Sequence, residues 1–322
     1  MDNSVELTVD AVVTWVNGND PKYQKKISNY RKIEQLKISE KLLSKYNQIG
    51  EITLCIKSIL KFAPFIRKIF IVTDQQDPKI EVKEKEKIVL IDHKEIFRGY
   101  EDYMPTFNIR TIETAFHRIR DLSEHFIYFN DDMFLIKPTT IHDWFNEEKK
   151  AIIRGKWSKS YNKIWYKRLK DFFISKNKRP GFNRAQSKSA EKLGFNEKYY
   201  KSFHTARPMI KSISEKYFDQ NPHIFINQIK YRFRNHDQFI SYSLNWHLMI
   251  KLNKAVLNSD TGNIEIHSIE KKSLKTLKKI TESSEKNESL FSINIQDMNK
   301  ASIESQKYLI NWINTILKKT YT

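Results

Sequence analysis

Apolar and polar positions form blocks along the first quarter of the chain that predict a strand followed by helices. Leu7 to Val16 is rich in Val and Thr, which is typical of a strand, and the turn residues Asn17-Gly18-Asn19-Asp20-Pro21 follow it. Lys22 to Tyr46 has a polar, basic helical pattern. Ile52 to Phe62 has apolar residues at helical spacing until Ala63-Pro64 interrupts them.

The alternation continues toward the middle of the chain. The pattern predicts strands at Ile69 to Thr73, Ile88 to Asp92 and Phe126 to Phe129, and an amphipathic helix at Thr111 to Leu122. Strands that alternate with helices indicate an α/β fold with a parallel or mixed sheet covered on both faces. Ligands of such sheets bind beyond the carboxyl ends of the strands. Three strands are followed there by polar residues: Asn17-Gly18-Asn19-Asp20, Thr73-Asp74 and Asn130-Asp131-Asp132.

The second half of the chain has a different pattern. Ile153 to Lys192 is basic and aromatic and contains the turn Arg179-Pro180-Gly181, so we expect an excursion or lid. Ile303 to Lys319 predicts a C-terminal helix. These patterns predict three parts: an α/β half at 1–152, a basic aromatic insertion or lid at 153–200, and a second half at 201–322 that includes the C-terminal helix.

Composition and charge narrow the class of protein. The chain has 322 residues, and 39% of them are hydrophobic, which is enough for a substantial core. Its 57 Lys and Arg against 38 Asp and Glu give a net charge of +19, which favours anionic partners such as a phosphorylated substrate, nucleic acid or an acidic membrane surface. The single cysteine, Cys55, excludes an intrachain disulfide and fits a cytoplasmic setting. No signal sequence or membrane-spanning run is present, so we expect any membrane contact to be peripheral.

Several polar groups have alternative interpretations from the residues alone. The adjacent carboxylates of Asp131 and Asp132 fit a site for Mg²⁺ or Mn²⁺ against a diphosphate, or a turn with solvated acids. The segment Thr14 to Asp20 fits a site for a base and ribose, or only a turn, and Asp74 fits a ligand contact or a helix cap. Neither a P-loop, nor a Gly-x-Gly-x-x-Gly motif, nor a zinc spacing is present.

Longer stretches resemble one family. Val9 to Pro21 reads VDAVVTWVNGNDP, and Leu54 to Pro138 contains PTFN at 105–108 and FIYFNDDMF at 126–134. These two stretches resemble the first and second conserved regions of the Stealth family, bacterial capsular polysaccharide phosphotransferases that are similar to the catalytic subunit of animal N-acetylglucosamine-1-phosphotransferase. The segment from His204-Thr205-Ala206-Arg207-Pro208 to Arg234 resembles the third conserved region of the family, and Phe291 to Asp297 resembles the fourth. The chain departs from the family pattern at one place. Many members have Ser and a small residue between Phe-Asn and Ile-Glu, whereas this chain has Ile109-Arg110-Thr111, and the departure affects the donor contacts expected of this loop.

The resemblance implies a glycosyltransferase-A-like α/β fold, a mixed sheet flanked by helices with a mainly helical insertion and C-terminal part. It also implies transfer of a hexose 1-phosphate, with an N-acetylhexosamine as the expected sugar, from a UDP-sugar to a hydroxyl of an anionic capsular or cell-surface polysaccharide, with release of UMP. The implied donor-binding residues are Thr14, Trp15, Val16, Asn17, Gly18, Asp74, Asn108, Glu113 and Asn130. The implied metal ligands for Mg²⁺ or Mn²⁺ are Asp131, Asp132 and Asp297, and the implied catalytic residues are His204 as base, Arg232, Arg234 and Asp237.

Two other functions fit parts of the sequence. A metal-dependent glycosyltransferase of the same fold would release UDP instead of UMP. The basic charge and the aromatic residues Trp157, Tyr161, Trp165 and Tyr166 fit a nucleic-acid-binding protein, but no nucleic-acid module is recognisable, so we expect no nucleic-acid partner. The C-terminal helix has an apolar stripe with basic flanks. It either packs on the core or holds the protein at the inner face of the membrane.

Overall fold

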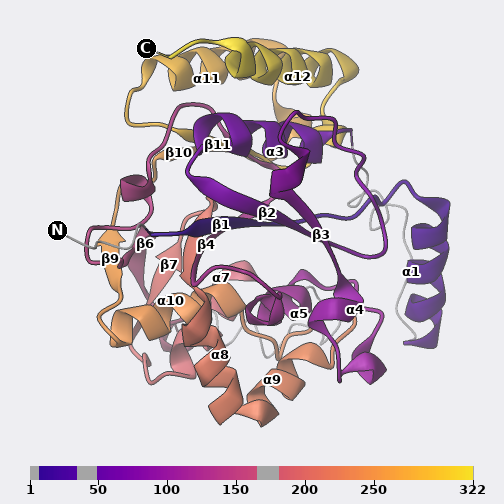
Figure 1. Ribbon diagram of the computed structural model, residues 1–322, viewed down its shortest axis with the longest axis vertical. Coiled ribbons are helices and arrows are strands. Elements are labelled where there is room, and N and C mark those ends of the chain that lie inside the picture. The colour runs from indigo at the N-terminus through magenta and orange to yellow at the C-terminus, as the bar shows by residue number, and fades with distance from the viewer. Residues whose placement is uncertain (1–6, 35–48, 165–180, 322) are drawn as a thin grey trace.

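A five-stranded mixed sheet lies at the centre of the molecule in the computed structural model, which describes residues 7–34, 49–164 and 181–321 (Figure 1). The first four strands in its order are parallel, and the last runs antiparallel to its neighbour. The order is β3 (Ile88–Asp92), β2 (Ile66–Thr73), β1 (Val9–Thr14), β4 (His125–Asn130) and β8 (Arg207–Ile210). The predicted α/β class with a mixed sheet is therefore confirmed.

The strand order reverses in the middle of this sheet. The chain adds β2 and then β3 on one side of β1, and it returns to the other side for β4. The loops after β1 and β4 consequently diverge at the carboxyl edge, and a crevice at such a reversal is where open α/β sheets bind ligands.

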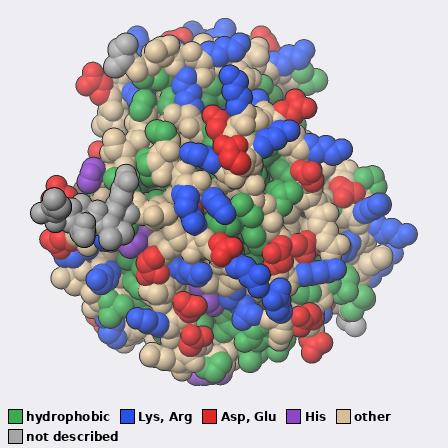
Figure 2. All heavy atoms as spheres, viewed as in Figure 1, with side chains coloured by type: hydrophobic (Ala, Val, Ile, Leu, Met, Phe, Trp, Pro, Cys, Tyr) green, Lys and Arg blue, Asp and Glu red, His purple; other side chains and the backbone are tan. Residues whose placement is uncertain are grey.

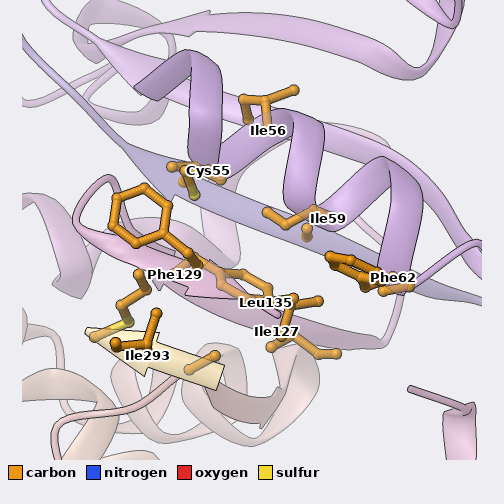
Figure 3. Packing of buried hydrophobic residues seen from close by; sticks show 14 of the residues in the cluster. Cys55, Ile56, Ile59, Phe62, Ile127, Phe129, Leu135 and Ile293 are labelled. Atoms are coloured by element: carbon orange, nitrogen blue, oxygen red, sulfur yellow. The ribbon is translucent and has the colours of Figure 1, made fainter. Parts of the chain in front are cut away.

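Side chains of β1 alternate between two hydrophobic cores, one on each face of the sheet. Val9, Ala11 and Val13 belong to the first core, and Val12 belongs to the second. Figure 3 shows the first core, in which residues of α3 (Glu51–Phe62) such as Ile59 pack over strand residues from several sheets. Because both faces are buried, the sheet is fixed in place below the loops at its carboxyl edge.

Helices cover both faces of the sheet (Figure 1). On one side lies α3, with α12 (Ile303–Lys318) and α11 (Leu274–Lys286) outside it. The other side carries a larger group that includes the short helices after β3 and before β4. This group is α4 (His93–Ile96), α5 (Ile109–Thr114), α7 (Phe182–Glu191), α8 (Lys211–Gln220), α9 (Pro222–Ile229) and α10 (Ser241–Lys251).

Two small sheets extend the central one. The first contains β10 (Asn263–Ile266), β11 (Ser292–Ile295) and β5 (Met133–Leu135), and it places residues near 265 and 294 beside the end of β4. The second contains β7 (Lys198–Ser202), β6 (Ala151–Lys159) and β9 (Ala255–Asn258).

Some predicted elements differ in the structure. The helix expected at Lys22 to Tyr46 is α1 (Pro21–Ile33), which starts at the Asp20 cap, while residues 35–48 lie outside the described residues. The helix expected at Thr111 to Leu122 was wrong in length, because α5 ends at Thr114 and only a 3₁₀ turn follows.

The predicted insertion is built into the fold at both of its ends. The boundary expected between residues 152 and 153 falls inside β6, whose first half pairs with β9 and whose second half pairs with β7. Outside the described residues lie Trp165 and Tyr166, together with Arg179 and Pro180 of the expected turn.

The C-terminal helix packs on the core, which is the first of the two alternatives that its apolar stripe left open. Leu309, Trp312, Ile313 and Ile316 are buried in the first core, and Trp312 Nε1 donates a hydrogen bond to Glu285 Oε1 at 2.7 Å. The pattern of one amphipathic helix does not distinguish a lipid surface from a protein surface as its partner, and α3 provides the latter.

Charged side chains of both signs lie on the surface of the molecule. On the face in Figure 2, Lys and Arg are interspersed with Asp and Glu. Among the described residues, no helix is both long and apolar enough to span a bilayer.

Candidate active site

A pocket of about 180 Å³ opens at the carboxyl edge of the central sheet. It is lined by the residues that end or follow β1, β2, β3 and β4, together with side chains from α1 and α5. The lining residues are Thr14, Trp15, Val16, Tyr23, Val72, His93, Phe107, Ile109, Ile112, Asn130 and Asp131. Four of the predicted donor-binding residues, Thr14, Trp15, Val16 and Asn130, are thus brought together here.

The turn after β1 is fastened to the loop after β2. Gln76 accepts a hydrogen bond from the Asn17 backbone N–H at 2.8 Å and donates to the Asn17 carbonyl oxygen and to Asp20. Gly18 lies in the same turn and accepts a hydrogen bond from Gln24. Asn17 and Gly18 therefore form the rim that positions Trp15 and Val16, rather than the lining itself.

Asp74 is engaged by a lysine of the first helix. Lys26 Nζ lies 2.8 Å from both carboxylate oxygens, and the Asp74 side chain is almost fully buried. This ion pair joins α1 to the end of β2. It places a positive and a negative charge close to the buried ring of His93.

Glu113 belongs to a buried polar network below the pocket. Tyr128 Oη donates to Glu113 Oε1 at 3.1 Å and lies 3.3 Å from Thr14 Oγ1. Burial raises the pKa of Glu113, and nearby arginines, Arg207 first, oppose the rise. Glu113 Oε2 is buried without a hydrogen-bond partner, so the network has an acceptor that the protein leaves unused.

At the end of β4, Asn130 contacts two residues of the third resemblance region. Asn130 Nδ2 lies 3.5 Å from His204 Nε2, and Arg207 Nη1 donates to Asn130 Oδ1 at 3.4 Å. Arg207 is fully buried on β8, with its guanidinium 4.2 Å from the centre of the Tyr242 ring. The antiparallel pairing of β8 with β4 produces this meeting of residues about 75 positions apart in sequence.

His204 is held from its other side by the small sheet. Its Nδ1 lies 3.3 Å from Glu265 Oε1 of β10 and 2.5 Å from Gln296 Nε2, and Gln296 also donates to Glu265. Nδ1 thus faces both an acceptor, Glu265 Oε1, and a donor, Gln296 Nε2, whereas Nε2 faces the donor Asn130 Nδ2. In the Nδ1–H tautomer, Glu265 accepts from the ring and Nε2 keeps its lone pair. Mainly because of the hydrogen bond with His204, the pKa of Glu265 lies below its ordinary value. The lone pair of Nε2 then faces Asn130 and the pocket edge.

The two carboxylates after Asn130 differ in environment. Asp131 lines the pocket, whereas Asp132 is buried enough that its pKa is raised, against the opposing charges of His204 and Arg207. Asp132 Oδ1 has no hydrogen-bond partner. An anionic pair with an unsatisfied buried oxygen fits a hard divalent cation, so these two residues fit the implied Mg²⁺ or Mn²⁺.

The third predicted ligand does not join them. Asp297 pairs with Lys300 at 2.7 Å, and no group of three His, Cys, Asp or Glu side chains within residues 7–34, 49–164 and 181–321 is arranged to hold a metal ion. The expected three-carboxylate set is therefore not assembled in this structure. Asn294 and Ile295 of β11 do contact this loop, since both donate to the backbone oxygen of Asp132.

Asn108 and Arg232 serve as braces in this structure. Asn108 caps α5 by accepting from Arg110 N and donates to Tyr231 O and Gln238 Oε1. Arg232 Nη2 donates to the backbone oxygens of Asp102 and Met104. Both side chains connect the loop before α5 to the loop before α10, and this connection positions Phe107 in the pocket wall.

Arg234 and Asp237 lie near the molecular surface. The charge of Arg234 acts on Glu113 and opposes the rise of its pKa, which burial causes. Asp237 accepts a hydrogen bond from Tyr231 Oη at 3.2 Å, and Lys188 Nζ lies 4.0 Å from it. Arg234 thus has an electrostatic link to the buried network, whereas Tyr231 and Lys188, which contact Asp237, do not line the pocket.

Some residues of the site were missed by sequence reasoning. Tyr23, His93 and Phe107 line the pocket, and Glu265 and Gln296 hold His204. His93 had a signal, because it directly follows the predicted strand Ile88 to Asp92. Glu265 lies on a short strand in a polar part of the chain, where no pattern identified it.

Comparison with protein families supports the resemblance in the first half of the chain. Residues 8–35 match Stealth protein conserved region 1, and residues 45–153 match Stealth protein conserved region 2. These are the segments that carry β1 to β4 and all of the residues that line the pocket. The resemblance predicted for the first two regions is confirmed, and that for the third and fourth remains a prediction.

Relatives of known name share this half. A receptor polysaccharide phosphotransferase of Streptococcus oralis is 42% identical over 141 residues, which are 44% of this chain and 42% of the relative. A capsular polysaccharide phosphotransferase of Haemophilus influenzae is 41% identical over 148 residues, which are 46% of this chain and 40% of the relative. The matched segment thus spans about two fifths of each relative's length.

Solved structures with a similar arrangement include two sugar transferases. Mouse xyloside xylosyltransferase 1 in its apo form has a TM-score of 0.39 and 12% identity, over 81% of this chain and 88% of the other. The galactosyltransferase LgtC has a TM-score of 0.43 and 9% identity, over 97% of both chains. These likenesses are too distant to bear on the chemistry of the site.

Proposed function

We propose that this chain, which carries Stealth conserved regions 1 and 2, transfers a hexose 1-phosphate from a UDP-sugar to a hydroxyl of a capsular or cell-surface polysaccharide and releases UMP. The observation that carries the proposal is the convergence of Asn130, His204 and Arg207 at the edge of a pocket built by the matched segments. The relatives are named as polysaccharide phosphotransferases, and these names support the same reaction class.

The pocket supplies a binding site for the nucleotide end of the donor. Aromatic side chains of Trp15, Tyr23 and Phe107 offer faces for a base. Asn130 and Asp131 end β4, and His93 follows β3, which lies at the other end of the strand order β3-β2-β1-β4. With the base against the aromatic side chains, the diphosphate extends toward Asn130 and Asp131. The +19 net charge of the chain favours the approach of both the anionic donor and an anionic polysaccharide.

Asp131 and Asp132 are the residues that would hold Mg²⁺ or Mn²⁺. Such an ion neutralises phosphate charge and polarises the phosphoryl oxygens. Arg207 adds a fixed positive charge beside Asn130, in a buried position where screening by water is weak. Arg234 is the further cation that we propose for the phosphoryl oxygens, while Asp237 remains a predicted catalytic residue without a recorded contact to the pocket.

His204 acts as the general base on the acceptor. Its Nε2 takes the proton of the acceptor hydroxyl as the acceptor oxygen forms a bond to the phosphorus that carries the sugar. The bond from that phosphorus to the bridging oxygen breaks, and UMP leaves with the electron pair. Glu265 and Gln296 keep the ring in the orientation that this transfer needs.

The released nucleotide tests this proposal directly. We would incubate the purified chain with Mg²⁺, a panel of UDP-sugars including UDP-N-acetylglucosamine, and capsule oligosaccharides. UMP together with a phosphodiester signal in phosphorus NMR is the expected result. UDP with a glycosidic product would instead establish the metal-dependent glycosyltransferase reaction and overturn the proposal.

A further inference from the structure

Two residues that line the pocket each have a buried polar atom without a hydrogen-bond partner. Trp15 Nε1 and His93 Nδ1 both belong to lining residues, and neither atom has a partner. Trp15 is 7% exposed and His93 is 1% exposed. Buried polar atoms are normally paired, so two orphans in one small pocket indicate that a ligand or an ordered water completes them.

These two atoms have complementary chemistry. The indole N–H of Trp15 is only a donor. Burial, the largest cause, lowers the pKa of His93 to about 4 against the opposing charges of Asp74 and Asp92, while Lys26 adds to the lowering. The ring is therefore neutral at neutral pH, and one of its nitrogens is an acceptor. A ligand that offers an acceptor and a donor on one edge would satisfy both.

The size of the pocket limits what that ligand is. Pockets for drug-sized molecules begin at roughly 300 Å³, and this one encloses about 180 Å³. It therefore takes one end of a nucleotide sugar. Asn130 and Asp131 end β4 and suit phosphate, whereas His93 follows β3, at the other end of the strand order β3-β2-β1-β4. The His93 side of the pocket therefore receives the opposite end of the donor, which is the base.

We infer that His93 is a specificity-determining residue that reads the Watson–Crick edge of a uracil base. With its proton on Nε2, His93 accepts the N3–H of uracil at Nδ1, and Trp15 Nε1 donates to a neighbouring carbonyl oxygen. Cytosine has a lone pair instead of a hydrogen at N3, so it places an acceptor against an acceptor. The inference rests on the proposed function, because it assigns the base of the proposed UDP-sugar donor.

Binding of nucleotides without the sugar tests the inference separately from catalysis. By titration calorimetry on the full chain with Mg²⁺, we expect UDP to bind at least about tenfold more tightly than CDP or 3-methyl-UDP, since a site built for a hydrogen bond rejects a ligand that lacks it. His93→Ala should weaken the binding of UDP by about tenfold or more. The affinities of the variant for UDP, CDP and 3-methyl-UDP should then lie within about threefold of one another.

A second buried histidine provides the matched control. His117 also has an unpartnered Nδ1 and a lowered pKa of about 3, caused chiefly by burial, but it packs against Phe218 and Phe225 and is not among the pocket residues. His117→Ala should keep the wild-type preference for UDP over CDP.

Several results would overturn the inference. An unchanged ratio of UDP to CDP affinity in folded His93→Ala would do so, as would equal binding of UDP and 3-methyl-UDP by the wild type, a comparison that needs no variant. If the wild type bound none of the three nucleotides, the proposed function itself would fail as well. The two failures are therefore distinguishable.

Discussion

Nδ1 of His204 lies 3.3 Å from Oε1 of Glu265, although His204 is in the loop between β7 and β8 and Glu265 is on β10 of a separate sheet. The contact fixes the ring so that Nε2 points toward Asn130 at the edge of the pocket. The proposed base therefore depends on a residue that is far away in sequence and does not line the pocket.

We first predict the effect of removing this support. Glu265→Ala should lower kcat by about 10- to 100-fold while KM for the donor stays near wild type, because the ring loses its orientation but remains present. This is part of the roughly 10²- to 10⁴-fold that a general base contributes. Glu265→Gln keeps an acceptor oxygen and should recover part of the rate. Glu270→Gln, at an exposed position nearby, is the control and should match the wild type.

His204 itself is the second test. His204→Ala should lower turnover by roughly 10²- to 10⁴-fold while UDP still binds, because the base acts on the acceptor and not on the nucleotide. Steady-state kinetics and calorimetry measure the two effects. Near-normal turnover, or loss of folding together with activity, would assign the proton transfer to another group.

The third prediction concerns the metal. Activity should require Mg²⁺ or Mn²⁺, and Asp131→Ala and Asp132→Asn should abolish most of it, because the phosphates lose their counter-charge. The isosteric Asp132→Asn keeps the backbone oxygen that accepts from Asn294 and Ile295, so the loop should remain folded. Full turnover in excess EDTA would refute the metal requirement. Asp297→Ala, which removes an ion pair with Lys300, should be far milder.

The fourth prediction tests the C-terminal helix as part of the core. Ile313 is fully buried on α12, whereas Ile303 on the same helix is 71% exposed. Ile313→Ala should reduce the free energy of unfolding by about 2–5 kcal/mol, and Ile303→Ala should change it by less than about 0.5 kcal/mol. Urea unfolding measures both. Equal effects would mean that α12 does not pack as described.

The fifth prediction is a loss of stability in mild acid. His247 is buried with a pKa lowered to about 4, chiefly by burial, and its Nε2 accepts a hydrogen bond from Tyr200 N at 2.9 Å. Between pH 6.5 and about 4 the unfolded chain therefore binds a proton that the folded chain excludes. The free energy of unfolding should fall with falling pH in that range, by up to ~1.4 kcal/mol per pH unit for this group.

Urea titrations at several pH values check this sign. His247→Gln should show a shallower fall between pH 6.5 and 4 than the wild type, even if the variant is less stable at pH 7. A variant whose stability falls as steeply as that of the wild type would show that other groups cause the acid sensitivity.

The sequence by itself determined the four parallel strands of the central sheet, but not β8, and the half of the site that lies on these strands. Val9, Ala11 and Val13 are apolar at alternate positions, and the turn at Asn17 follows at once, so periodicity and turn chemistry locate β1 and the loop that bears Trp15. The same local logic located Asn130 and Asp131. Residues that end neighbouring parallel strands must lie at one edge, which is why this cluster was predictable.

Only the tertiary structure decided what each polar side chain contacts. The family resemblance implies a donor-binding role for Asn108 and a catalytic role for Arg232, and the structure shows that both side chains also brace neighbouring loops. Glu265 meets His204 only because β10 joins β11 and β5 beside the end of β4. Likewise α12 covers α3, a choice that an amphipathic stripe cannot make alone. Such contacts depend on how separate elements pack in space, and one-dimensional periodicity carries no information about the partner that an apolar face or a side chain will meet.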